Sequence, residues 1–344
     1  MIEPMEARLV DALPEGEGWQ YEPKWDGFRC LAVIVDGEVE LISKSGKPLG
    51  RYFPEVVAGL AGLPDCVLDG ELIIPVGPTL SFEALQMRLH PAESRVRKLA
   101  AETPARFMLF DLLSLKRDPE LAARPLKERR AALEQLYAEH RSDLLRLSPK
   151  TEERADAVRW LEGTGTALDG VIAKRIDEPY RAGERAMLKV KRMRTADCVI
   201  GGFRYAAKKK EVGSLLLGLY DEAGLLHHVG FCSGLAGIDK AALTKELEAL
   251  VEAPGFTGDA PGGPSRWATE RSTEWSPLRA SLIVEVRFDH ITGHRFRHGT
   301  LFLRWRPDKR PDQCTMEQLG EEARPAIVDA AIAGSTDRPK RASR

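Results

Sequence analysis

Several short segments of the sequence carry charged residues that could do chemistry. Lys24 lies in the segment YEPKWDGFR, and Lys189 and Lys191 lie two residues apart in LKVK, where a strand would present both on one face. Glu71, in LDGELI, stands among apolar residues, where a carboxylate is unfavourable unless it meets a partner, a hydroxyl group or a metal. Taken alone, each segment is also typical of an ordinary turn or edge strand, so no single one identifies a site.

Strands must position most of these residues. Residues 31–43 form two apolar runs around Asp36-Gly37, a dipeptide typical of a tight hairpin turn, so Lys24 lies just before a hairpin. Further strands are expected over residues 66–75, 105–113, 168–175 and 186–192, and a helix over 125–140 with Pro125 at its start.

From Asp197 onward the pattern changes to short strands. They are expected over residues 197–206, 213–220, 225–232, 281–291 and 300–306, with one helix near 238–252. This pattern suits a small Greek-key barrel of the OB type. We therefore expect one domain at 1–193, a second at 194–320, and a mobile polar tail at 321–344.

Composition limits the class of protein. The chain has 344 residues, 43% of them hydrophobic, and a formal charge of −1, which excludes a uniformly basic nucleic-acid-binding protein. Residues 191–310 nevertheless carry 19 basic and 14 acidic side chains, so a polyanion site is expected there. The five cysteines are widely spaced and predict reduced thiols, and the histidines have no carboxylate partner identifiable from sequence and predict no metal site. No apolar run is long enough for a membrane helix, and we expect a cytoplasmic protein.

The order of the charged segments resembles that of the covalent nucleotidyltransferases, which comprise ATP-dependent DNA ligases, RNA ligases and mRNA capping enzymes. The series is KWDGFR, SKSG, LDGEL, FxxFD, DGVxAK, LKVKR and RWRPDK. Within that superfamily, residues 3–319 resemble the small stand-alone bacterial DNA ligases of the LigC type, related to the ligase domain of end-joining ligases. The resemblance implies an α+β fold: a nucleotidyltransferase (ATP-grasp-like) domain of antiparallel sheets and helices, followed by a β-barrel OB-fold domain.

The resemblance makes Lys24 the nucleophile. It would attack the α-phosphorus of ATP, form a lysyl-AMP phosphoramidate and release pyrophosphate. Only a free amine can attack, and a lysine has an ordinary pKa of about 10.4, so neighbouring cations that lower this pKa are useful. Lys174, Lys189 and Lys191 are expected near Lys24, where they would also neutralise charge on the α-phosphate.

The resemblance also implies roles in nucleotide and metal binding. Glu71 would hold the ribose, Phe110 would stack on the adenine, and Arg29 would contact the nucleotide. Glu22, two residues before the nucleophile, would read the adenine amino group. Asp169, where the family more often has glutamate, would lie near a divalent metal together with Glu71.

Two further motifs, SKSG and RWRPDK, carry residues expected to contact phosphates. Lys44 in SKSG replaces the usual arginine of that motif, which removes a planar, two-pronged contact to phosphate. Arg306 and Lys309 in RWRPDK would orient the β- and γ-phosphates as pyrophosphate leaves. On charge alone, RWRPDK is equally typical of a solvated basic strand end.

The resemblance thus implies an ATP-dependent DNA ligase that seals 3′-hydroxyl and 5′-phosphate ends in nicked double-stranded DNA, with a repair role. It implies ATP and Mg²⁺ or Mn²⁺ as cofactors. It also implies a monomer that associates with the nucleoid when it acts and has no membrane partner. Three alternatives remain: an RNA ligase, a capping-type guanylyltransferase that uses GTP, and a catalytically inactive nucleic-acid-binding protein.

Overall fold

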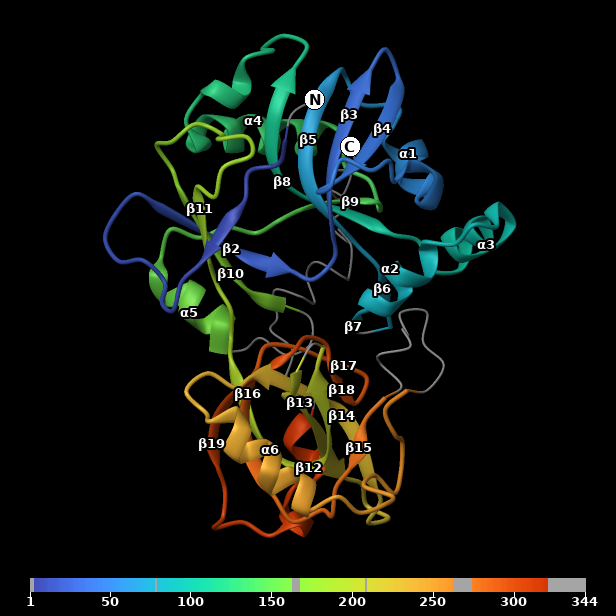
Figure 1. The fold of residues 1–344 in the computed structure, drawn as a ribbon. Helices are drawn as coiled ribbons and strands as arrows, with labels where there is room; N and C mark the ends of the chain where they lie inside the picture. The colour runs from blue at the N-terminus through green and yellow to red at the C-terminus, as the bar shows by residue number, and fades with distance from the viewer. Residues whose placement is uncertain (1–2, 78, 163–167, 208, 263–273, 321–344) are drawn as a thin grey trace, which may run out of the picture. The chain divides into compact units, whose positions relative to one another are not determined.

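The computed structural model describes residues 3–77, 79–162, 168–207, 209–262 and 274–320 (Figure 1). The chain divides into two compact units between Arg192 and Met193. The tail predicted at 321–344 lies outside the described residues.

The first unit contains two main sheets with helices packed against them (Figure 1). One sheet has the strand order β1 (Ala7–Leu9), β11 (Met187–Val190), β10 (Leu168–Arg175) and β2 (Trp19–Trp25). The other has the order β4 (Glu38–Ser43), β3 (Phe28–Val35), β5 (Cys66–Ile73), β8 (Arg106–Leu115) and β9 (Leu145–Leu147). The remaining elements are the pair β6 (Pro75–Val76) and β7 (Thr79–Leu80), and the helices α1 (Pro54–Leu60), α2 (Phe82–Arg88), α3 (Glu93–Glu102), α4 (Leu126–Glu139) and α5 (Arg154–Glu162).

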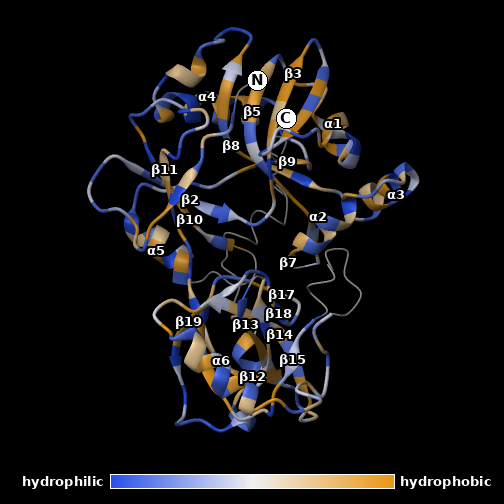
Figure 2. Ribbon diagram, viewed as in Figure 1, coloured by the Kyte–Doolittle hydropathy of each residue, from blue (hydrophilic) through white to orange (hydrophobic). Residues whose placement is uncertain are grey.

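The predicted hairpin is confirmed as β3 and β4. Asp36 and Gly37 connect the strands with φ angles of 50° and 80°, the positive values that a tight hairpin turn requires. Hydrophobic residues run along β3 and β5 (Figure 2), and their buried side chains form the core beneath α1. The other four strands and the helix predicted in this unit are present as β5, β8, β10, β11 and α4.

Helix α4 is fixed to β8 by a buried ion pair. Arg129 donates two hydrogen bonds to the Asp111 carboxylate, at 2.8 and 2.9 Å. The two side chains are only 1% and 2% exposed, so water contributes little to their solvation. The aspartate of the FD motif therefore supports the fold and does not face a ligand.

The sheets of the first unit are antiparallel except for short edge pairings. The three-residue strands β1 and β9 pair in parallel with β11 and β8. A strand of only three residues is too short to show an alternation of apolar and polar side chains. The sequence therefore did not predict β1 or β9.

The second unit is a closed barrel. Its strands are β12 (Arg194–Ala206), β13 (Lys209–Tyr220), β14 (Leu226–Gly234), β15 (Ser276–Pro277), β16 (Ile283–Phe288), β17 (Ile291–Thr292), β18 (Arg295–Phe296) and β19 (Thr300–Trp305), with helix α6 (Lys240–Ala249) inserted after β14. The order β13-β14-β19-β16-β12 closes because β12 also pairs with β13. The predicted barrel with one inserted helix is confirmed.

The predictions for the cysteines and for the histidines had different outcomes. All five cysteines are free, as predicted, and all are buried, which the sequence did not indicate. His227, however, lies 2.9 Å from a carboxylate oxygen of Asp221, and His298 lies 3.0 Å from Asp289, so the expectation that the histidines lack carboxylate partners was wrong. The described residues contain no group of three or more His, Cys, Asp or Glu side chains placed to hold a metal. None of the described helices is long and apolar enough to cross a membrane.

Candidate active site

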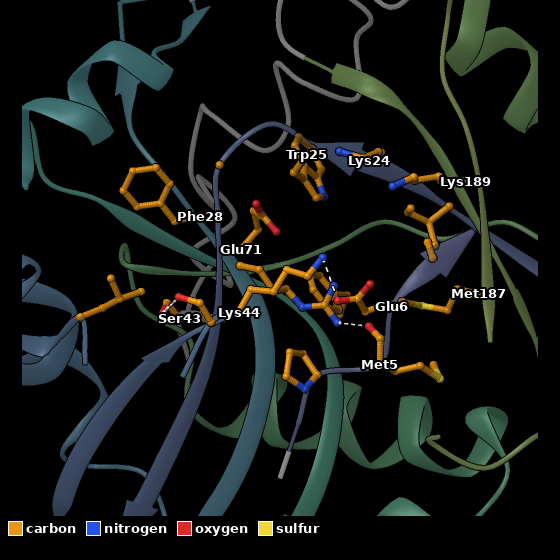
Figure 3. Close-up of a pocket in the computed structure, with 18 of the residues that line it drawn as sticks. Met5, Glu6, Lys24, Trp25, Phe28, Ser43, Lys44, Glu71, Met187 and Lys189 are labelled. Carbon is orange, nitrogen blue, oxygen red and sulfur yellow. Dashed lines mark hydrogen bonds and ion pairs between the residues drawn. The ribbon is translucent and has the colours of Figure 1, made fainter. Parts of the chain in front are cut away.

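A cavity of about 1,020 Å³ in the first unit is lined by residues of both main sheets (Figure 3). Eight of the predicted site residues line it: Glu22, Lys24, Arg29, Lys44, Glu71, Phe110, Lys174 and Lys189. Arg306 and Lys309 belong to the second unit. Residues distant in sequence therefore converge on one cavity, whereas Asp169 and Lys191 are not part of its lining.

Lys24 ends up beside Asp169 because of an irregularity in strand pairing. Lys24 pairs with Gly170 and Trp25 with Leu168, so Asp169 is the extra residue of a β-bulge, a feature that re-aims a side chain. Lys24 Nζ donates to Asp169 Oδ2 at 2.5 Å, and Lys191 Nζ lies 3.2 Å from the same oxygen. The amine must leave this contact and lose a proton before it can attack phosphorus.

Lys24, Lys189 and Lys191 form a cationic cluster around one carboxylate. Burial, and then the charges of Lys24 and Lys191, lower the pKa of Lys189. Burial by itself would raise the pKa of Asp169, but the charges and hydrogen bonds of Lys24 and Lys191 outweigh burial and lower it. The cluster presents more positive than negative charge, which suits an incoming phosphate group.

Glu71 projects from β5 into the same cavity (Figure 3). Burial raises its pKa to about 7, although the charges of Lys24 and Arg29 oppose that change. A carboxylate in this state favours a ligand that brings hydroxyl donors or a cation. Both roles predicted for Glu71, the ribose contact and the metal contact, meet that requirement.

The pKa of Glu71 predicts pH-dependent nucleoside binding. With a pKa of about 7, the ionised fraction rises from about one tenth at pH 6 to about nine tenths at pH 8. An ionised carboxylate accepts stronger hydrogen bonds from ribose hydroxyls, so adenosine binding measured by calorimetry should tighten several-fold over this range. Glu71→Gln should flatten the profile, and an unchanged profile in the variant would assign the titration to another group.

Arg29 is oriented by two residues that sequence reasoning missed. Its guanidinium donates to both oxygens of Asp69, each at 2.6 Å. The Tyr180 hydroxyl donates to Asp69 at 2.7 Å and accepts from the Met5 N–H at 2.7 Å, so the Asp69 carboxylate is itself fixed. Asp69 lies two residues before Glu71 on one strand, and this spacing was the available signal; Tyr180 carried none.

Lys174 lies elsewhere in the cavity than predicted. In the β10–β2 register it pairs with Gln20, four positions from the Gly170–Lys24 pair, so the strand carries it away from Lys24. Lys174 Nζ instead lies 2.7 Å from Glu22 Oε1, and both side chains are buried. The prediction that Lys174 neighbours the nucleophile was therefore wrong, because the antiparallel register separates them.

Phe110 lines the cavity with cations close to its ring. The Arg29 guanidinium lies 4.4 Å and Lys174 Nζ 4.8 Å from the ring centroid. The ring is only 7% exposed, so stacking on a base requires one of these side chains to move. Its adenine contact stays a prediction.

Comparison with known proteins gives the family. The family model described as "ATP dependent DNA ligase domain" matches residues 4–191, and that of the "ATP dependent DNA ligase C terminal region" matches residues 208–309. The chain belongs to the ATP-dependent DNA ligases. DNA ligase C2 of Mycolicibacterium smegmatis is 46% identical over 92% of this chain and 94% of its own length. DNA ligase C of Mycobacterium tuberculosis is 43% identical over 92% of this chain and 93% of its own length, so the ligase is of the LigC type.

The fold agrees with that family. A solved Lig E DNA ligase superposes with a TM-score of 0.54 at 19% identity, covering 89% of this chain and 100% of the other. The α+β fold with a nucleotidyltransferase domain and an OB-fold domain is therefore confirmed.

In this ligase Lys44 is held at the cavity wall by an ion pair. Its Nζ lies 2.9 Å from Glu6 Oε1, and its side chain is largely exposed (Figure 3). A single ammonium group cannot make the bidentate contact of an arginine, but it can still offer a point charge to a phosphate.

Gly27 of the KWDG segment has no room for a side chain. A Cβ built there would lie 2.1 Å from the Leu72 carbonyl oxygen of β5. Glycine thus lets the chain that follows Lys24 pass close to β5, where Glu71 is located.

The donor chemistry near Lys24 suits a hard divalent cation. Mg²⁺ is usually held by one or two carboxylates together with substrate phosphates, not by an all-protein cage. Asp169 and Glu71 supply two carboxylates, and both interact electrostatically with Lys24. These are the residues of the ligase that would hold the metal.

Proposed function

We propose that this ligase seals nicks in double-stranded DNA in three steps, with Lys24 as the nucleophile. Lys24 Nζ loses a proton and attacks the α-phosphorus of ATP; a P–N bond forms and pyrophosphate leaves. An oxygen of the DNA 5′-phosphate then attacks the AMP phosphorus and releases Lys24. Finally the 3′-hydroxyl attacks the activated 5′-phosphate, and AMP departs.

The observation that carries the proposal is the placement of Lys24 in the cavity wall beside Asp169, Lys189 and Lys191. Asp169 accepts from the amine, while the two neighbouring lysines offer positive charge to the α-phosphate. Arg29, fixed by Asp69, is available to the nucleotide. A bound Mg²⁺ or Mn²⁺ would supply further neutralisation of phosphate charge.

Other residues are assigned to the remaining parts of the nucleotide. Glu71 holds the ribose, and Glu22 and Phe110 receive the adenine. Arg306 and Lys309 contact the β- and γ-phosphates as pyrophosphate leaves, which requires the second unit to act as a movable lid. We further propose that the ligase acts as a monomer in the cytoplasm, on repair intermediates at the nucleoid.

Nucleotide labelling tests this function. Incubation with α-labelled ATP should leave AMP covalently bound, and intact-mass measurement should show its addition, while GTP should not label. Nicked DNA should be sealed faster than nicked RNA in parallel assays. Labelling by GTP alone would indicate a guanylyltransferase, preference for RNA an RNA ligase, and no labelling a binding protein.

Asp169→Asn tests the metal site. An amide keeps the size of the side chain but is a poorer ligand for a hard cation, so the Mg²⁺ concentration for half-maximal AMP labelling should rise by about 10- to 100-fold. Mn²⁺ binding in the presence of a non-hydrolysable ATP analogue, followed by electron paramagnetic resonance, should weaken in parallel. Unchanged Mn²⁺ affinity would remove Asp169 from the metal site.

A further inference from the structure

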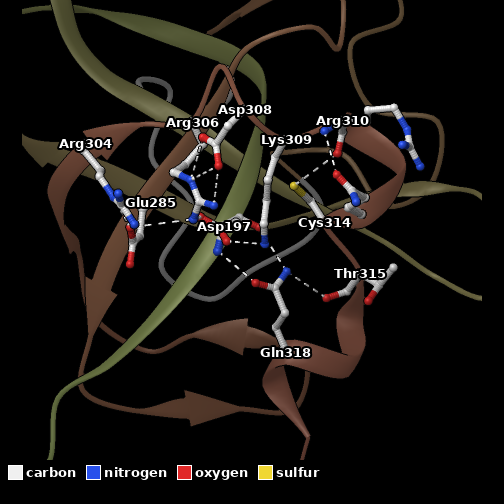
Figure 4. Close-up of polar contacts among 11 residues, drawn as sticks. Asp197, Glu285, Arg304, Arg306, Asp308, Lys309, Arg310, Cys314, Thr315 and Gln318 are labelled. Carbon is white, nitrogen blue, oxygen red and sulfur yellow. Dashed lines mark hydrogen bonds and ion pairs between the residues drawn. The ribbon is translucent and has the colours of Figure 1, made fainter.

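Arg306 and Lys309 share one carboxylate in the second unit. Both follow β19, and both contact Asp197 on β12 (Figure 4). Arg306 Nη1 donates to Asp197 Oδ1 at 2.8 Å, and Lys309 Nζ donates to Asp197 Oδ2 at 2.5 Å. One aspartate thus sets the spacing of two cations that come from an irregular segment.

Asp197 is itself rigidly held. It is 7% exposed and lies in β12, which pairs with β16 at this position. The Gln318 side chain also contacts its backbone on both sides: the amide oxygen accepts from the Asp197 N–H at 2.9 Å, and the amide nitrogen donates to the Asp197 carbonyl at 3.1 Å (Figure 4). The carboxylate therefore has little freedom to follow its partners if they move.

Arg306 contacts Asp197 through a single guanidinium nitrogen, Nη1. Its other edge, Nε and Nη2, donates to Asp308, at 2.9 and 2.8 Å to the nearer oxygens. The Asp308 side chain is 62% exposed, whereas that of Asp197 is 10% exposed. This edge has the parallel N–H geometry that binds a carboxylate or a phosphate with two hydrogen bonds. The contact with the buried Asp197 can persist while the edge that faces the exposed Asp308 exchanges its partner.

We propose that Asp197 is a positioning residue that holds Arg306 and Lys309 in the arrangement needed to receive the leaving pyrophosphate. This inference rests on the proposed function, in which those two cations contact the β- and γ-phosphates. Arginine and lysine side chains have many rotamers, and a fixed carboxylate removes that freedom before the nucleotide arrives. Asp197 acts through these two side chains and touches no reacting atom.

Separate measurement of the steps tests the role of Asp197 in the full-length chain. Asp197→Asn should slow formation of the AMP adduct from ATP by about 10- to 100-fold. Sealing of a nick that already carries 5′-AMP needs no pyrophosphate departure and should keep the parental rate. Glu285→Gln is the matched control: it removes another carboxylate of the same cluster, 3.8 Å from Arg306, and should leave adduct formation nearly unchanged.

A double-mutant cycle separates positioning from general stability. If Asp197 acts through Arg306, Asp197→Asn should cause little further loss in an Arg306→Ala background. Asp197→Glu, which keeps the charge but displaces the carboxylate by one methylene, should show a smaller loss confined to the same step, and it serves if the asparagine variant fails to fold.

Three results would overturn the inference. They are adduct formation at the parental rate in Asp197→Asn, equal slowing of both steps, and additive losses in the cycle. A parent protein that never forms the adduct would instead refute the proposed function, and this inference with it.

Discussion

Replacing Lys24 by alanine should abolish the covalent AMP adduct and reduce nick sealing by about 10⁶-fold, the scale seen when a covalent nucleophile is removed. The reason is structural: Lys24 lines the cavity and donates to the bulged Asp169, while Lys191, which also contacts Asp169, lies outside the cavity lining just after β11. The measurement is intact mass after incubation with ATP and Mg²⁺, together with gel analysis of a nicked duplex.

The control for this prediction is Lys98→Ala. Lys98 lies on α3 with its side chain 72% exposed, and its removal should change neither the adduct nor sealing. Retention of nicked DNA by Lys24→Ala should stay close to that of the parent, since binding depends on many phosphate contacts. An adduct of undiminished yield in Lys24→Ala would place the nucleophile elsewhere.

The largest effect on stability is expected at the buried pair of Arg129 and Asp111. Arg129→Met keeps the length of the side chain but leaves the Asp111 carboxylate buried without its cation, which should lower the free energy of unfolding by about 3–5 kcal/mol. Arg129 also donates to the carbonyls of Arg124 and Glu178, and the variant loses these hydrogen bonds too. Urea unfolding, followed by hydrogen exchange of peptides from α4 and β8, measures the loss where it occurs.

An exposed pair provides the comparison. Arg97 and Glu93 form an ion pair along α3 with side chains 74% and 70% exposed. Arg97→Met should change the free energy of unfolding by about 0.5 kcal/mol or less, because water solvates both groups once they are separated. Equal effects of the two substitutions would mean that burial of the Arg129 pair has been overestimated.

Sequence patterns predicted most of the elements around the site but missed β2, the strand that carries Lys24. The hairpin at Asp36-Gly37 and the helix that follows Pro125 depend on local turn and capping chemistry, which the sequence shows directly. The ordered motifs then located Lys24 and Glu71 correctly in one cavity.

The contacts that sequence missed depend on register and on distant partners. A bulge brings Asp169 to Lys24, and the register of β10 with β2 carries Lys174 away to Glu22. Neither follows from alternation, which fixes only the face on which a side chain lies. Tyr180 supports Asp69 from 111 positions away, a pairing that a single sequence cannot reveal.

The closure of the barrel by β12 limits where this ligase can be divided. The strand pairs with β16 through residues from Arg194 to Val199 and with β13 through residues from Val199 to Ala206. Both pairings therefore depend on one continuous segment. A fragment intended for separate expression of the C-terminal unit must therefore start at or before Arg194. A later start would remove part of β12, the strand that joins β13 to β16. The unpaired strand edges left behind would be prone to aggregation.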